Sequence, residues 1–328
     1  MPAASSLAIV LLGATLAATS PEPLLRIQDP ALVESSGLAA SVWHEGILWT
    51  HADGGSVAEV RALDSGGETV ATVTLEGIDP YDPEALAPGD RQGLPTLFLG
   101  DIGDNLEKRP DVSVFRFAEP LEVRDQTVEA TWYRFTYPDG PHDAEALLVH
   151  PGTGRLLIAT KSAGGGGLYE APSNLLTADE GSNRLVRVAD VPPLVTDGAY
   201  LPDGRLALRT YASVFVYDRP GHQVATATLP LQPQGESLAV DGDRGILLVG
   251  SEGPRSTVYA VPIPVAASQS SSPDSRSGTD PRQDRAGNAD GESPDASSLS
   301  TVYRVARVVG ILLLLAGLVA YFRRTRRR

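Results

Sequence analysis

The chain has 328 residues, of which 42% are hydrophobic, and it contains 33 Gly, 26 Pro and no Cys. The lack of Cys excludes disulfide bonds and thiolate chemistry, and the many turn-forming residues favour short strands over long helices. The formal net charge is −14, and the seven Arg residues from position 304 onwards contribute +7, so the remainder carries −21. Such an acidic chain argues against nucleic acid and favours cations or basic partners, although a solvated anionic surface also explains the charge.

The N-terminal part begins with an apolar run, Leu7–Ala18, that ends in small residues and is followed closely by Pro21. This pattern is typical of a secretory signal peptide, which we place at residues 1–20. A buried N-terminal helix is the alternative interpretation, because no Lys or Arg precedes the apolar run. The next segment, Leu24–Gln28, is a short run with strand character that has no obvious pairing partner nearby in the sequence.

A six-residue acidic motif is repeated along the chain that follows. Its five copies are Glu34–Ala39, Asp82–Ala87, Asp143–Leu148, Thr196–Leu201 and Gln234–Ala239. The third residue is Glu in three copies, Ser36 in the first and Gly198 in the fourth. Aligned residues of successive copies are 48, 61, 53 and 38 positions apart. Periods of this size in a chain of short β segments predict the four-stranded blades of a β-propeller.

We therefore predict an all-β, five-bladed β-propeller over residues 21–264, with six blades as the alternative. From Glu34 to Pro264, apolar segments punctuated by Gly, Pro and Asp divide into five units. The fifth unit is one strand short of a complete blade. Leu24–Gln28 can supply that outer strand, which would close the ring and remove an exposed sheet edge.

The C-terminal part changes composition twice. Residues 265–300 are rich in Ser, Asp, Pro and Gly, which predicts a disordered linker. Residues 301–322 predict a single transmembrane helix, although the uncharged run from Val308 spans only about 23 Å and Arg307 would have to snorkel. The Arg-rich tail, 323–328, predicts a cytoplasmic C-terminus. The sequence thus predicts a single-pass cell-membrane protein whose propeller lies outside.

Polar residues gather in the loops that a propeller places at one mouth of its central channel. Calcium prefers oxygen ligands, and the predicted metal ligands are Asp82, Glu84, Asp101, Asp104, Asn105, Asp143 and Glu145. The predicted ligand-binding residues are His51, Lys161, Arg209 and Glu236, which bring an imidazole and charges of both signs to the same mouth. The alternative interpretation is that Asp and Asn only form turns and that the basic residues only neutralise nearby carboxylates.

The motifs of common enzyme classes are missing from the sequence. The run Gly164–Gly167 is not a phosphate loop, because no Gly-Lys-[Ser/Thr] follows it. The chain also lacks Gly-x-Ser-x-Gly and His-Glu-x-x-His. Nucleophilic catalysis of the usual kinds therefore has no support.

Several segments resemble a group of secreted or membrane-anchored β-propeller proteins of high-GC Gram-positive bacteria, over about residues 30–262. These segments are Ser36–Ala39, Trp49–Asp53, Asp82–Ala87, Gly100–Asn105, Tyr137–Leu147, Val195–Ala199 and Gln234–Ala239. More distantly, the motifs of Glu84, Glu145 and Glu236 look like those of phytase-like and esterase-like propellers. That resemblance implies an acidic mouth, bridged by calcium, that binds phosphoesters.

Three functions stay open at this point. The first is a membrane-anchored extracytoplasmic binding module whose acidic mouth holds calcium and takes a small molecule, a glycan or a protein partner. The second is a calcium-dependent phosphoester hydrolase, in which Lys161 and Arg209 would hold the phosphate and a metal-bound water would attack it. The third is a scaffold whose acidic mouth is incidental.

Overall fold

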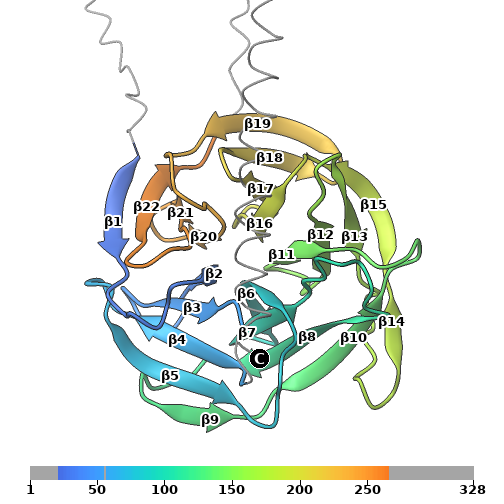
Figure 1. Cartoon of the computed structure of the whole chain (residues 1–328), viewed down its shortest axis with the longest axis horizontal. Helices are drawn as coiled ribbons and strands as arrows, with labels where there is room; N and C mark the ends of the chain where they lie inside the picture. The colour runs from blue at the N-terminus through green and yellow to red at the C-terminus, as the bar shows by residue number, and fades with distance from the viewer. Residues whose placement is uncertain (1–20, 55–56, 266–328) are drawn as a thin grey trace, which may run out of the picture. The chain divides into compact units, whose positions relative to one another are not determined.

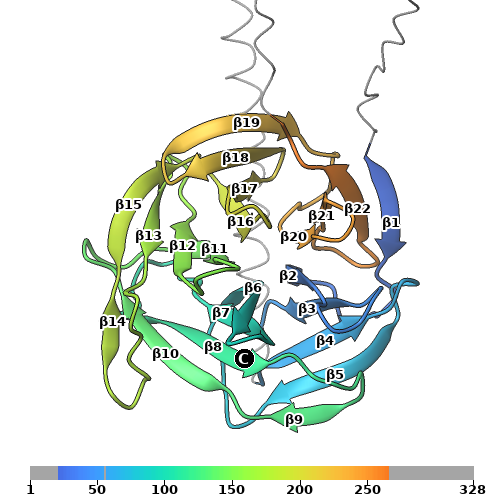
Figure 2. The same cartoon turned by 180° about the vertical axis from the view of Figure 1, so that it is seen from behind.

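The computed structural model describes residues 21–54 and 57–265, and these residues form strands, turns and loops without a helix. Their strands make five sheets around a central axis (Figure 1), and Figure 2 shows the same ring from behind. The predicted all-β, five-bladed β-propeller is confirmed. Within the two described ranges, no helical segment is suited to crossing a membrane. The predicted signal peptide, transmembrane helix and Arg tail, and the linker beyond Val265, lie outside the described residues.

The five blades are numbered in chain order, and their strands are given from the channel outwards. Blade 1 contains β2 (Ser35–Ala40), β3 (Leu48–Ala52), β4 (Glu59–Leu63), β5 (Thr69–Leu75) and β9 (Gln126–Val128). Blade 2 contains β6 (Pro83–Arg91), β7 (Leu94–Asp101), β8 (Val112–Ala118), β10 (Thr131–Thr136) and β14 (Ser182–Arg184). Blade 3 contains β11 (Ala144–Val149), β12 (Leu156–Thr160), β13 (Gly166–Glu170) and β15 (Val186–Val191). Blade 4 contains β16 (Val195–Tyr200), β17 (Leu206–Thr210), β18 (Ser213–Arg219) and β19 (His222–Thr228). Blade 5 contains β20 (Leu238–Asp241), β21 (Ile246–Val249), β22 (Thr257–Pro262) and β1 (Glu22–Arg26).

The ring closes by pairing its two ends. Strand β1 runs antiparallel to β22 and forms the outer strand of blade 5, as the isolated segment Leu24–Gln28 predicted. Just beyond β1, the Ile27 N–H donates to the Ser256 carbonyl at 2.9 Å and extends this pairing. The two ends of the domain therefore share one sheet, and β22 is not left as an open edge.

Two short strands cross from one blade to the edge of the preceding blade, which the sequence did not predict. Strand β9 comes from blade 2 and pairs in parallel with β5 of blade 1. Strand β14 comes from blade 3 and pairs in parallel with β10 of blade 2. Each has only three residues and is mostly polar, so it lacks the alternating apolar pattern that identifies a strand.

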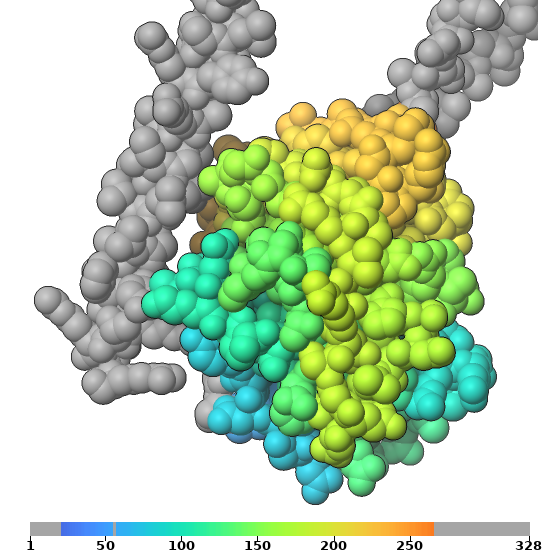
Figure 3. All heavy atoms as spheres, turned by 90° about the vertical axis from the view of Figure 1, so that its right-hand side faces the viewer, coloured from blue at the N-terminus to red at the C-terminus, as the bar shows by residue number. Residues whose placement is uncertain are grey.

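The hydrophobic core lies between neighbouring blades. Because a blade is covered on both sides, its inner strands are buried on both faces, as in Leu156–Thr160. Between blades 1 and 2, Trp49 packs in one cluster with Leu86 and Leu97, and its indole N–H donates to Glu119 at 2.9 Å. Burial of such side chains contributes about 1.5–3 kcal/mol each. Figure 3 shows blades from the middle of the chain, in green to orange, packed against one another.

Candidate functional site

The channel mouth is built in the same way in four of the five blades that the structure describes. In each, the backbone N–H of a residue after the second strand donates to the carbonyl of the first motif residue. These pairs are Asp53–Glu34 at 2.9 Å, Gly103–Asp82 at 3.0 Å, Lys161–Asp143 at 2.9 Å and Glu252–Gln234 at 2.8 Å. We call the four donors the facing positions. The shared hydrogen bond makes them structurally equivalent, and each lies beside the acidic motif of its own blade.

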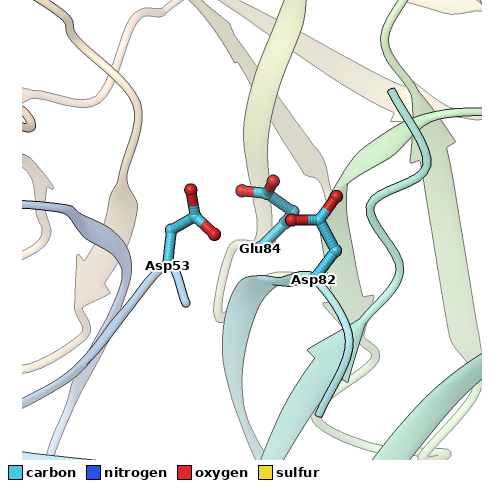
Figure 4. A group of neighbouring side chains, drawn as sticks. All are labelled: Asp53, Asp82 and Glu84. Carbon is cyan, nitrogen blue, oxygen red and sulfur yellow. The ribbon is translucent and has the colours of Figure 1, made fainter. Parts of the chain in front are cut away.

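Three carboxylates converge where blades 1 and 2 meet (Figure 4). Asp53 is the facing residue of blade 1, and Asp82 and Glu84 are the first and third motif residues of blade 2. One carboxylate oxygen of each lies within 4.8 Å of the others. Gly103 makes room for them, because a Cβ there would lie 2.6 Å from Asp82 Oδ2 and 2.9 Å from Glu84 Cγ. We call Asp53, Asp82 and Glu84 the acidic triad.

The acidic triad lies in a strongly negative environment. Burial raises the pKa of Glu84 well above its usual value, and surrounding carboxylates raise it further. These neighbours are Glu145, Asp53, Asp82 and Glu236. A cation between the triad carboxylates would relieve their repulsion and favour the ionised form of Glu84. The oxygen-only donor set suits Ca²⁺, which takes about six to eight oxygens, so water or a bound ligand would complete the shell.

A second group of charged residues comes from blades 3, 4 and 5. Lys161 Nζ forms an ion pair with Glu145, lies 4.0 Å from Glu236 Oε1 and lies 5.4 Å from the centre of the Tyr211 ring. The Tyr211 hydroxyl donates to Glu236 Oε1 at 3.4 Å. Burial alone would lower the pKa of Lys161, but Glu145, Tyr211 and Glu236 hold it well above its usual value. We call Glu145, Lys161, Tyr211 and Glu236 the lysine cluster, and its amine is a cation at neutral pH.

Glu252, the facing residue of blade 5, is held by neutral donors. Ser36 donates to Glu252 Oε1 at 2.7 Å, and the Gln234 side-chain amide donates to Oε2. Burial, with the nearby Glu236 as a further cause, raises the pKa of Glu252 to about 10. Glu252 is therefore protonated at neutral pH. The Ser that replaces Glu in the first motif copy avoids placing another carboxylate beside it.

Two predicted metal ligands, Asp101 and Asp104, organise the loop that follows β7. Asp101 Oδ1 accepts hydrogen bonds from the Asp82 N–H at 2.8 Å and from the Arg109 guanidinium at 2.9 Å. Asp104 Oδ2 accepts the N–H groups of Lys108 and Arg109, both at 2.6 Å. Asp101 thus fixes the backbone of a triad residue, whereas Asp104 shapes its own loop.

The other predicted metal ligands lie apart from the triad's three oxygens. Asp143 Oδ1 accepts the Asp104 N–H at 2.9 Å, and burial raises the pKa of Asp143. Asn105 is exposed on the same loop, and Glu145 belongs to the lysine cluster. Of the predicted metal ligands, the structure therefore brings Asp82 and Glu84 together. Their third partner, Asp53, was not among the predicted metal ligands.

His51 and Arg209, predicted to bind a ligand, lie in the wall of the mouth. His51 is 1% exposed, and burial lowers its pKa to about 4, so its ring is neutral at neutral pH. Arg209 is fully buried. Its guanidinium donates to Ser237 O at 2.5 Å, Gly250 O at 2.8 Å and Gln232 Oε1 at 2.7 Å. Arg209 therefore ties blade 4 to blade 5, and among the predicted ligand-binding residues Lys161 and Glu236 belong to the lysine cluster.

Comparison with known proteins finds similar solved structures at low sequence identity. No family model and no curated protein matches the chain. Luciferin-regenerating enzyme is a similar solved structure, with 13% identity, a TM-score of 0.44 and coverage of 71% of this chain and 80% of that chain. A gluconolactonase from Xanthomonas campestris has 14% identity, a TM-score of 0.41 and coverage of 76% and 99%. The calcium-binding protein regucalcin from Agrobacterium tumefaciens has 15% identity, a TM-score of 0.41 and coverage of 73% and 94%. These identities are too low to carry a function from those proteins to this chain.

Proposed function

We propose that this chain is a membrane-anchored, extracytoplasmic β-propeller that holds one divalent cation in its mouth, with Ca²⁺ as the best chemical match. The cation would take part in binding a small molecule, a glycan or a protein partner. The observation that carries the proposal is the convergence of Asp53, Asp82 and Glu84 from two blades, with oxygens within 4.8 Å of one another. Carboxylates this close repel one another unless a cation or a proton lies between them.

The surroundings of the triad support the same proposal. Asp101 holds the Asp82 N–H, and Arg109 in turn holds Asp101, so the motif backbone is fixed before any cation binds. Such supporting contacts orient the ligands of metal sites and commonly change metal affinity by about 10–100-fold when removed. The proposed location rests on the sequence alone, namely on the predicted signal peptide, transmembrane helix and Arg tail.

The hydrolase alternative needs basic side chains that can reach a phosphate beside the cation. Lys161 is paired with Glu145, and Arg209 is fully buried with its donors on backbone carbonyls and Gln232. This arrangement favours a binding module over a hydrolase.

The proposal is tested by measuring the melting temperature of the purified full chain in EDTA, in Ca²⁺ and in Mg²⁺. A cation at 100 times its Kd that binds only the folded state adds about 2.7 kcal/mol of stability. For a domain of this size, we expect the melting temperature to rise by about 5–10 °C. Glu84→Gln should abolish the rise, whereas Glu34→Gln, which removes an exposed carboxylate from the same motif in blade 1, should keep it.

Two results would contradict the proposal. A wild-type chain whose melting temperature is the same in calcium and in EDTA would exclude a cation that stabilises the fold. Turnover of p-nitrophenyl phosphate that requires calcium and disappears in Glu84→Gln would favour the hydrolase.

A further inference from the structure

We infer that the mouth contains two cation positions and that the ammonium group of Lys161 permanently occupies the second. The first position is the acidic triad. The total of two positions therefore rests on the proposed function. The second position is assigned from the contacts of Lys161 alone. Its consequence is that the mouth accepts one cation from solution and not two.

The facing positions of blades 1 and 3 are structurally equivalent. Asp53 in blade 1 and Lys161 in blade 3 make the same backbone hydrogen bond to the first motif residue of their blades, at 2.9 Å in both. Both side chains therefore start from matching points of the repeat. The facing side chain is a carboxylate in blade 1 and an ammonium in blade 3.

Blade 4 has no carboxylate at the third position of its motif. Its third motif residue is Gly198, and the adjacent Asp197 is 1% exposed. The Asp197 carboxylate accepts the N–H groups of Gly198 at 2.7 Å and Leu238 at 2.5 Å, so it is used inside the wall. Lys161 consequently contacts Glu145 of its own blade and lies 4.0 Å from Glu236 of blade 5, beyond the blade 4 motif.

The groups around the Lys161 ammonium are of the kinds that bind a cation. Two carboxylates and the face of the Tyr211 ring lie around Lys161 Nζ, and anions and aromatic faces both attract a cation. The Lys161 side chain is 18% exposed, whereas those of Glu145 and Glu236 are each 6% exposed. Without the ammonium, Glu145 and Glu236 would face each other as like charges and would require a proton or another cation.

Calorimetric titration of the full chain with Ca²⁺ tests the inference through the number of ions bound. We expect one ion for the wild type and for Lys161→Arg, which keeps the charge. We expect two ions for Lys161→Met, which keeps an apolar stem and removes the charge. In EDTA, Lys161→Met should melt below the wild type, and calcium should restore the difference.

A second neutral variant and a combined variant keep the test decisive. Lys161→Gln should also bind two ions, so the result does not depend on the folding of Lys161→Met. Lys161→Met combined with Glu145→Gln should return to one ion, because the second position has lost a carboxylate as well.

The outcomes separate this inference from the proposed function. One ion in the wild type and still one in both neutral Lys161 variants would overturn the inference and leave the proposed function in place. No ion in the wild type but one in the neutral variants would support the second position and contradict the proposed function. Two ions in the wild type would overturn the inference.

Discussion

The acidic triad and the lysine cluster arise from the same repeated motif but balance their charge in different ways. In the lysine cluster, Lys161 supplies a cation from the chain itself to Glu145 and Glu236. In the acidic triad, the equivalent facing residue is Asp53, which adds to the effects of burial and of Glu145 in raising the pKa of Glu84. Burial also raises the pKa of Glu145, but there Lys161 acts against the rise. The residue type at one repeat position thus decides whether the chain itself places a cation beside its carboxylates.

Glu252 shows a third way to balance charge at the same repeat position. Ser36 donates to it, and burial together with the adjacent Glu236 raises its pKa to about 10, so a proton takes the place of a cation. Under the proposed function, a lysine, a metal ion and a proton are three alternatives at facing positions of one fold. Variants that exchange or remove these groups test the comparison directly.

The largest effect on stability is expected from Arg209→Met, which removes a cation from the wall instead of the mouth. The substitution leaves the Ser237 and Gly250 carbonyls without their donor and takes a positive charge away from the buried Asp197. Removing one partner of a buried charged network costs about 3–5 kcal/mol. Urea unfolding should show this loss, whereas calcium stoichiometry should stay unchanged. A loss below about 1 kcal/mol would mean that Arg209 does not tie the two blades together.

The second-largest effect is a loss of calcium affinity that we expect for a triad variant and not for a lysine-cluster variant. Asp82→Asn should weaken calcium binding by at least about 100-fold, which corresponds to about 2.7 kcal/mol, because it removes one of three charged ligands. Glu145→Gln should leave calcium affinity within a few-fold of the wild type and should lower stability, because Lys161 loses its closest partner. Titration calorimetry measures both variants. Equal loss of calcium affinity in the two would remove the distinction between the two parts of the mouth.

The smallest effect is a pH dependence carried by Glu252 in the absence of metal. Its folded pKa of about 10 lies above the ordinary value of 4.5, so between these values the folded state binds more protons than the unfolded state. Stability should therefore fall as pH rises through this window, by at most about 1.4 kcal/mol per pH unit. Urea unfolding in EDTA at pH 6.5 and pH 7.5, between which the change is at most about 1.4 kcal/mol, measures the slope. Glu252→Gln should make the slope shallower, while Glu84, whose pKa is also raised, keeps part of it. An unchanged slope in that variant would assign the titration to other groups.

Much of the fold was predictable because the motif repeats at blade-like intervals and marks the innermost strand of each blade. The closing strand β1 was predictable because the fifth unit lacked a strand and an apolar segment near the N-terminus lacked a partner. Strands β9 and β14 were not, because three polar residues carry no periodic pattern and pair only once a neighbouring edge is in place.

The sequence predicted which loops form the site, but it did not predict where their side chains point. The sequence placed Asp101, Asp104 and Arg209 at the mouth, but their side chains serve backbone groups of the surrounding loops and wall. Asp53 was not predicted as a metal ligand, because the residues at the facing positions share no sequence motif. The sequence signal for Asp53 is its place directly after the second strand of blade 1, which is the place that Lys161 has in blade 3.

The most direct test of the central claim is a crystal structure of the protein grown in calcium-containing buffer. We expect a calcium ion in contact with carboxylate oxygens of Asp53, Asp82 and Glu84, at about 2.3–2.6 Å, while Lys161 stays beside Glu145. A calcium ion held by Asp101, Asp104 and Asp143 instead, or a triad that contains only water, would contradict it.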